Sequence, residues 1–303
     1  MLLDTASLYF RAFYGVPDSL RAPDGTSVNA VRGLLDFLST LISAYAPTSV
    51  ACCWDNDWRP TWRVELIDTY KTHRLRTDQD GLIIDQEEVP DGLERQIPII
   101  QDVLYAVGIP IIGVDQYEAD DVIATLASVA ESPVDIVTGD RDLFQLVNDE
   151  DQIRVLYTSR GVRNHDVITS MEVQQRFGVT PQQYVDFAVL RGDASDGLPG
   201  VKGIGDKTAA KLINEYHDLE HVLLAAAQPE SELTKSVRNR LLDAQDYLAA
   251  ATRVVRVATN LPVSSSDLEL PQTPANPDEL QRLQQQWGLG GSVDRLVATL
   301  ASQ

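Results

Sequence analysis

Acidic residues recur in this sequence directly after apolar, strand-like runs. The carboxyl ends of parallel strands meet at one edge of a sheet, so carboxylates that are distant in sequence would gather there. Like charges brought together repel, and hard divalent cations with oxygen ligands, Mg²⁺ or Mn²⁺, would neutralise them. Two such ions can activate a water and stabilise the leaving oxygen of a phosphodiester. The residues concerned are Asp4, Asp55, Glu118, Asp120, Asp121, Asp140 and Asp142.

A simpler interpretation exists for any one of these residues. A single aspartate after a strand is usually a helix N-cap or a turn residue, and Asp121 fits that role. Capping is a poor explanation for several successive strands that all end in carboxylates. The four histidines are dispersed and lack zinc spacing, so oxygen ligands alone are expected.

Residues 192–213 read GDASDGLPGVKGIGDKTAAKLI and carry a glycine-rich turn between two predicted helices. The core Gly203-Ile204-Gly205 lets the backbone approach a phosphate, and the helix that follows presents N–H donors at its N-terminus. A plain turn between helices is the alternative. The motif contacts no base edges, so DNA binding would be independent of sequence. Lys202, Lys207 and Lys211 add positive charge, and Asp193 and Asp196 could complete a second metal site.

Residues 59–76 form a basic stretch in an acidic chain. The simpler interpretation is a solvated helix face. If residues 62–74 are helical, Lys71 and Arg74 lie on one face of that helix, three residues apart. The polar, acidic stretch 75–92 that follows is predicted to be a mobile loop or arch.

Apolar periodicity predicts the elements that position these groups. Strands are expected at 2–3, 49–54, 109–114 and 134–138, alternating with helices, which indicates right-handed βαβ units and a mostly parallel sheet. From about residue 170 the pattern becomes helical, and a Pro- and Ser-rich stretch, 260–278, reads as a linker or extended wrap. The helices are expected at 28–45, 93–107, 118–130, a short one from 142, 181–190, 207–213, 235–250 and 278–301. We therefore predict an α/β domain over 1–170, with a loop or arch at about 70–98, and a helical subdomain over 171–303.

Composition narrows the class of protein. The net charge of −20 over 303 residues argues at first against nucleic acid, but a multi-metal site is itself rich in carboxylates and the ions restore positive charge locally. No run of about 18 apolar residues and no secretory signal are present. The only cysteines, Cys52 and Cys53, are adjacent, which excludes a disulfide framework and favours a reducing cytoplasm.

Six segments together resemble the 5′ nuclease family, which includes flap endonucleases and the N-terminal 5′–3′ exonuclease domain of bacterial DNA polymerase I. They are LLDTASLYFRAF (2–13), CWDN (53–56), YKTHR (70–74), YEADDVIATLA (117–127), TGDRDLFQLV (138–147) and the 192–213 segment. The resemblance implies a PIN-like α/β nuclease with a helix–three-turn–helix (helix–hairpin–helix) DNA clamp at 198–213. It implies a stand-alone, monomeric enzyme of DNA replication and repair that acts on DNA with a 5′ flap, nick, gap or 5′ end, in partnership with a DNA polymerase and a ligase.

The resemblance also assigns roles to residues. It places Asp4, Asp55, Glu118, Asp120 and Asp140 at a first metal region, and Asp142, Asp193 and Asp196 at a second, with Asp121 nearby. It makes Lys71 and Arg74 contacts of the scissile phosphate, catalytic together with Asp120 and Asp140. Arg11 and Tyr70 join the glycine turn and its lysines in binding DNA, and the backbone carbonyls of Val201 and Ile204 would hold a K⁺ ion in the clamp turn. Two departures from the family pattern are a longer loop after Arg74, and Gly197 where the family usually has Asn.

Two other classes of function are compatible with parts of this pattern. The first is a catalytically inactive DNA-binding protein that uses the helix–hairpin–helix and keeps the acidic cluster as a relic. The second is a phosphotransferase of another α/β family, but it would not need the glycine hairpin, and the sequence has no GxxxxGK[ST] nucleotide loop. The intact set of carboxylates argues against a relic.

Overall fold

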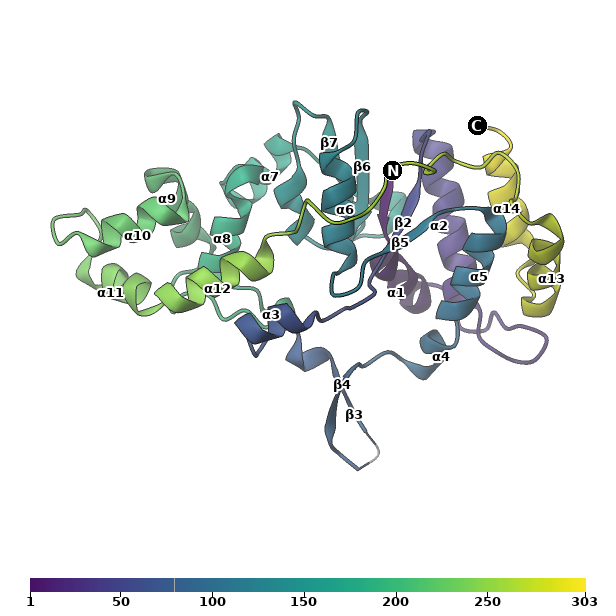
Figure 1. Ribbon diagram of the computed structural model, residues 1–303, viewed down its shortest axis with the longest axis horizontal. Coiled ribbons are helices and arrows are strands. Elements are labelled where there is room, and N and C mark those ends of the chain that lie inside the picture. Colours follow the sequence, from purple (N-terminus) through teal and green to yellow (C-terminus); the bar gives the residue numbers. More distant parts are fainter. Residues whose placement is uncertain (79) are drawn as a thin grey trace.

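A six-stranded sheet forms the centre of the structure, a computed structural model that describes residues 1–78 and 80–303. Five strands run parallel in the order β5-β2-β1-β6-β7, and β8 closes one edge antiparallel to β7 (Figure 1). The predicted parallel strands are present within a few residues of their expected ends. They are β1 (Leu2–Asp4), β2 (Ala51–Trp54), β5 (Ile111–Gly113) and β6 (Val134–Thr138); β7 (Ile153–Tyr157) and β8 (Asp166–Ile168) were not among the predicted strands.

Helices cover both faces of this sheet, and each face has its own apolar core. Successive side chains of a strand point to opposite faces, so Leu2 packs in one core and Leu3 in the other. The predicted 28–45 helix is α2, which buries Leu34, Leu38 and Ile42 because they recur every four residues. One face carries α1 (Thr5–Gly15), α2 (Asn29–Tyr45), α5 (Ile97–Val107), α13 (Pro277–Trp287) and α14 (Gly290–Leu300); the other carries α6 (Ala119–Ser128) and the 3₁₀ turn η2 (Asp142–Leu146).

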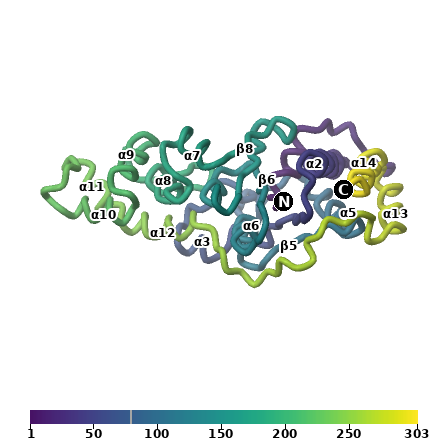
Figure 2. Tube along the Cα trace, turned by 90° about the horizontal axis from the view of Figure 1, so that it is seen from above, coloured from purple at the N-terminus to yellow at the C-terminus, as the bar shows by residue number. Residues whose placement is uncertain are grey.

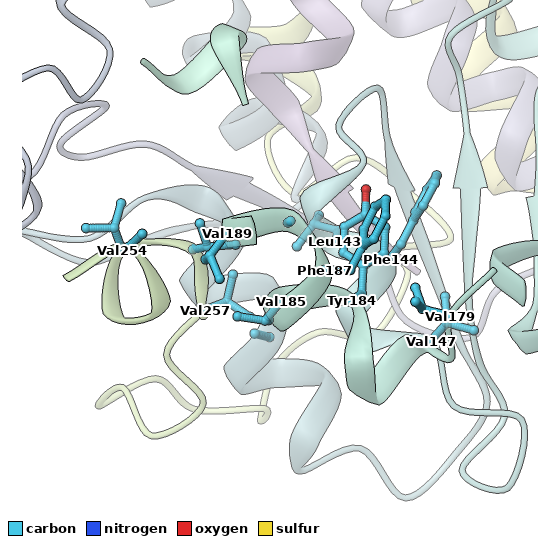
Figure 3. Packing of buried hydrophobic residues seen from close by; sticks show 14 of the residues in the cluster. Leu143, Phe144, Val147, Val179, Tyr184, Val185, Phe187, Val189, Val254 and Val257 are labelled. Atoms are coloured by element: carbon cyan, nitrogen blue, oxygen red, sulfur yellow. The ribbon is translucent and has the colours of Figure 1, made fainter. Parts of the chain in front are cut away.

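The helical subdomain extends from the α6 side of the sheet, at the left of Figure 1. An aromatic cluster joins it to the sheet domain. The ring centroid of Phe144 in η2 lies 5.8 Å from that of Tyr184 (Figure 3) and 5.9 Å from that of Phe177. This packing sets the position of the glycine-rich turn relative to the strand ends. The subdomain comprises α7 (Ser170–Phe177), η4 (Pro181–Gln183), α8 (Tyr184–Arg191), η5 (Ala194–Asp196), α9 (Asp206–Tyr216), α10 (Leu219–Ala227), α11 (Lys235–Asp243) and α12 (Gln245–Val255).

The stretch after α12 runs back along the sheet domain, as Figure 2 shows from above. The backbone of Leu268 accepts a hydrogen bond from Val50, and that of Ala275 donates one to Val107. The last two helices, α13 and α14, then pack in the core shared with α2 and α5. We therefore propose a division in which 277–300 belongs with the sheet domain rather than with the predicted 171–303 subdomain.

The segment between β2 and α5 differs from its prediction in two ways. Residues 62–74 are not one helix, because α3 (Thr61–Leu66) ends early and Lys71 adopts a left-handed conformation, with φ +50°, before the 3₁₀ turn η1 (Thr72–Arg74). The predicted loop at 75–92 contains an antiparallel hairpin, β3 (Leu75–Thr77) and β4 (Ile83–Glu87), followed by α4 (Asp91–Glu94). Residue 79, within that predicted loop, lies outside the described residues.

The remaining short element is η3 (Val162–Asn164), which follows β7. None of the helices in the described ranges is both long and apolar enough to cross a membrane. Cys52 and Cys53 are buried in β2 and unbonded to each other.

Candidate metal centre and nucleic-acid interface

Five of the predicted carboxylates line one pocket of about 220 Å³ at the carboxyl ends of the central strands. The chain direction explains this convergence, since β1, β2 and β6 run parallel and end at the same edge. Two cations, Lys71 and Arg74, line the same pocket, together with Glu87 from the hairpin. The five carboxylates are those of Asp4, Asp55, Glu118, Asp120 and Asp140.

Helix N-termini and strand ends hold these side chains in place. Asp4 is the N-cap of α1, and its carboxylate accepts hydrogen bonds from the Ser7 amide at 3.1 Å and the Thr138 hydroxyl at 2.6 Å. Asp55 accepts one from the Ala119 amide at 2.7 Å, which links the end of β2 to the start of α6. Several oxygens are thereby oriented, and others remain available in the pocket.

The pKa values of the pocket carboxylates indicate that the pocket lacks positive charge. Burial, then the nearby charge of Asp55, raises the pKa of Asp4 from 3.8 to about 7. Burial, followed by Asp140 and Asp4, raises the pKa of Asp120 well above its ordinary value. Burial and Glu118 likewise raise the pKa of Asp55. Carboxylates gathered in this way favour their neutral forms unless positive charge is added.

The second predicted group lies beside this pocket, where η2 faces the helical subdomain. Burial, then Asp140 and Asp196, raises the pKa of Asp142 well above normal. Burial raises the pKa of Asp196 to about 6, although Lys71 opposes the shift. Asp193 is already paired, with Arg191 at 3.1 Å. The three carboxylates assigned to a second metal region thus lie beside the pocket, and their role in metal binding stays a prediction.

The two cations differ in their surroundings. The Nζ atom of Lys71 donates to Glu118 at 2.6 Å. Burial lowers the pKa of Lys71, but Glu118, Tyr70 and Asp196 together outweigh it and raise this pKa well above its ordinary value. The guanidinium of Arg74 is 36% exposed and lies 3.3 Å from Asp196. Lys71 keeps its left-handed backbone because its amide donates to the Asp196 carbonyl at 3.0 Å.

The donor set suits a hard divalent cation. It consists of five carboxylates, three of which (Asp4, Asp55 and Asp120) have raised pKa values, in a pocket large enough for ions and their waters. Over the described ranges, no three His, Cys, Asp or Glu side chains already close around a single point. Mg²⁺ does not require such a cage, because it keeps several waters and is held by one or two carboxylates plus substrate phosphate.

Two of the predicted site residues, Asp121 and Tyr70, do not line the carboxylate pocket. Asp121 is fully buried and points away from the pocket: both of its oxygens accept from Arg63 at 2.9 Å, and one also accepts from the Ala258 amide at 2.8 Å. Its carboxylate is thus already occupied by Arg63 and a backbone amide, and its place near the metals stays a prediction. Tyr70 is only 3% exposed and donates to both Glu118 oxygens, at 2.9 and 3.2 Å, so it positions a carboxylate rather than offering a surface to DNA.

The glycine-rich turn was predicted to bind phosphate, and several of its residues are exposed. Gly205 is the N-cap of α9, and a Cβ placed there would meet nothing within 4 Å, so its backbone is open to a ligand. Gly203 is also exposed, with φ +76°. Val201 and Ile204 are buried, and the Val201 carbonyl accepts the Ile204 amide, so the K⁺ role of their carbonyls remains a prediction. The three lysines, Lys202, Lys207 and Lys211, are all exposed.

Gly197 marks where the subdomain meets the 67–74 segment. Its φ is +73°, and a Cβ would lie 2.1 Å from the Thr69 carbonyl oxygen. The Thr69 hydroxyl donates to the Gly197 carbonyl at 2.8 Å. Asparagine tolerates this φ, but its Cβ could not be accommodated against Thr69, which explains glycine at this position.

Arg11 lies in a second, larger cleft of about 990 Å³. This cleft shares Ser7 and Phe10 with the pocket that the five carboxylates line, which we call the metal pocket. Arg160 and Arg163, from the loop after β7, line the same cleft. Sequence reasoning missed these two residues, because nothing in their spacing links them to α1. It also missed Glu87, whose place depends on the register of the hairpin.

Comparison with known proteins gives a consistent result. Residues 1–178 match the family described as 5′–3′ exonuclease, N-terminal resolvase-like domain, and residues 179–278 match 5′–3′ exonuclease, C-terminal SAM fold. A 5′–3′ exonuclease of Streptomyces coelicolor is 52% identical over 302 residues, covering 100% of both chains. One of Mycobacterium tuberculosis is 43% identical, covering 99% of this chain and 97% of its own.

A phage T5 flap endonuclease, solved in a complex with DNA and metal ions, has a similar structure. The TM-score is 0.64 at 16% identity, and the likeness covers 100% of this chain and 97% of the phage chain. At this identity the likeness concerns the fold. The predicted fold class, a mostly parallel PIN-like sheet domain with a helical subdomain, is confirmed.

Proposed function

The chain belongs to the 5′–3′ exonuclease family and is a nuclease, and we propose that it cuts DNA phosphodiesters at 5′ flaps and 5′ ends by a two-metal mechanism. We propose that the enzyme recognises the shape of the DNA substrate and not its base sequence. The proposal includes a role in DNA replication and repair, in which a polymerase and a ligase process the cleaved end. It also includes action as a monomer.

One observation carries the chemical part of the proposal: carboxylates from the ends of three parallel strands and from the start of α6 share one pocket with two cations. Bound Mg²⁺ or Mn²⁺ would supply an activated water and stabilise the leaving oxygen. Asp4, Asp55, Glu118, Asp120 and Asp140 would hold the first metal region, and Asp142, Asp193 and Asp196 the second.

The cations of the pocket act on the substrate. Attack on a phosphodiester builds negative charge on the non-bridging oxygens, and Arg74 lies where it could donate to them. Lys71 contributes charge while its bond to Glu118 orients that carboxylate. Because Tyr70 and Arg63 also contact Glu118, this residue is held rigidly at the helix start.

The substrate would be held by its backbone on two sides of the pocket. The turn at 200–205 and the start of α9 offer backbone amides and exposed lysines to duplex phosphates. A K⁺ ion in the clamp turn would add to this contact. On the other side, the cleft with Arg11, Arg160 and Arg163 offers guanidinium groups near aromatic side chains, a combination that suits a nucleic-acid strand.

Cleavage of a labelled 5′-flap duplex, with and without Mg²⁺, tests the proposal. We expect Mg²⁺-dependent cleavage by the wild type, and none by folded Asp120→Asn or Asp140→Asn variants. Tight DNA binding without metal-dependent cleavage would instead favour the alternative, an inactive DNA-binding protein. Near-wild-type cleavage by a folded Asp120→Asn, Asp140→Asn double variant would exclude the two-metal mechanism.

A further inference from the structure

Glu87 is a carboxylate of the metal pocket that comes from the hairpin rather than from the sheet. It is the last residue of β4 and pairs with Leu75, the residue directly after Arg74. The next amide, that of Glu88, donates to the Arg74 carbonyl at 2.7 Å. The hairpin register therefore places Glu87 beside the two cations of the site.

The other acidic side chains of this segment have partners outside the pocket. Asp85 pairs with Arg59 at 3.1 Å, and Asp91 and Glu94 pair with Arg76 at 3.6 and 3.5 Å. For the carboxylate of Glu87, no hydrogen bond or ion pair is found within residues 1–78 and 80–303.

Glu87 instead faces other carboxylates. Burial and then the charge of Asp55 raise its pKa; Arg74 and Lys71 lower it in part, and Glu118 raises it by a smaller amount. A half-buried carboxylate that meets only like charge and two already shared cations is unfavourable unless a further cation is added. The pocket that Glu87 lines is the one whose five carboxylates suit a divalent ion.

We propose that Glu87 is an additional carboxylate of the metal centre, through which bound divalent cations draw the β3–β4 hairpin onto the pocket. This inference rests on the proposed function, because it requires that the pocket bind such ions. Without them, the repulsion from Asp55 and Glu118 opposes the approach of the Glu87 end of the hairpin to the pocket, while Arg59 and Arg76 tie other parts of the hairpin segment down. The position of the hairpin would then depend on whether the site holds metal ions.

Glu88 supplies a matched control, because it is adjacent in sequence, is exposed and does not line the pocket. Binding of Mn²⁺ to the full-length protein without DNA can be followed by electron paramagnetic resonance. We expect Glu87→Gln to raise the Mn²⁺ dissociation constant by about tenfold, as the loss of a supporting carboxylate typically does, and Glu88→Gln to leave it unchanged. Equal affinities of Glu87→Gln and the wild type would overturn the proposal.

A second measurement follows the hairpin itself. Hydrogen exchange of residues 75–87 should slow when Mg²⁺ is added to the wild type and to Glu88→Gln, but not with Glu87→Gln. The same slowing in Glu87→Gln would contradict the coupling. If Glu87→Gln binds Mn²⁺ normally and binds DNA more tightly without metal, its carboxylate only repels phosphate and the proposal fails. Absence of Mn²⁺ binding by the wild type would instead reject the proposed function, so the two failures are distinguishable.

Discussion

Replacement of Asp121 by asparagine should destabilise the fold and leave cation binding intact. The Asp121 carboxylate has two 2.9 Å bonds to Arg63 and accepts from the amides of Glu118 at 3.2 Å and Ala258 at 2.8 Å. Both members of the ion pair are buried, with side-chain exposures of 3% and 0%. An amide in place of the carboxylate removes the charge and turns an NH₂ group toward a donor.

The expected size follows from these contacts. Removal of one partner of a buried ion pair typically costs about 3–5 kcal/mol. Glu118 remains 3.3 Å from Arg63 and compensates in part, so we expect about 3 kcal/mol, the low end of that range. For 303 residues, an unfolding entropy of about 2 cal/mol/K per residue gives about 0.6 kcal/mol/K, so the Tm should fall by about 5 °C.

The adjacent Asp120→Asn variant should do the opposite in both respects. Asp120 carries a raised pKa because burial and the neighbouring carboxylates disfavour its charge, so a neutral amide should stabilise the metal-free protein. It should also weaken Mn²⁺ binding, since Asp120 lines the pocket. Thermal unfolding in a chelator and Mn²⁺ titration of both variants provide the comparison. Normal stability with lost Mn²⁺ binding in Asp121→Asn would refute this assignment and restore Asp121 as a ligand.

Lys71→Ala and Arg74→Ala should each lower the single-turnover cleavage rate by about 10²-fold or more, because each removes a cation from the site where charge develops. A modest loss of DNA affinity with an unchanged rate would mean that they are ordinary surface cations. Lys202→Ala combined with Lys207→Ala should weaken binding to all duplexes alike and reduce the salt slope by about one unit per lost phosphate contact; a new sequence preference would contradict this. The metal-free protein should lose stability as pH rises from 3.8 to about 7, since the folded state holds the Asp4 proton more tightly than the unfolded state does. Urea denaturation in a chelator measures this loss, Mg²⁺ should reduce it, and stability that rises with pH over this window in the chelator would contradict the raised pKa.

The sequence alone was sufficient to predict which strand ends gather. In parallel βαβ units the chain direction requires that the carboxyl ends share one edge, so Asp4, Asp55 and Asp140 had to converge once the strands were recognised. The glycine turn was equally accessible, because two glycines before a helix and flanking lysines are a local pattern. The boundaries of α2 and the end of α5 also followed from local periodicity, whereas α5 begins at Ile97 rather than at 93.

Only the tertiary structure decided the orientation of individual side chains. Glu118 is an N-cap with extended backbone, φ −89° and ψ 165°, so helical spacing does not describe where it and Asp121 point relative to the pocket. Asp121 faces Arg63, which lies 58 residues earlier in the chain. An unpaired buried charge is unfavourable because it has lost its hydration, so a buried charged side chain needs a partner. Packing rather than sequence spacing decides which residue that partner is, and the partner decides the role of the charged side chain.

The same reason applies to the segment after β2. Composition marked it as basic, but the left-handed turn at Lys71 is stabilised by a carbonyl of Asp196 from the other domain. Glu87 enters the pocket through cross-strand pairing with Leu75, and a shift of one residue would turn it to the opposite face. Contacts between segments that are distant in sequence determine these positions, and no local pattern encodes them.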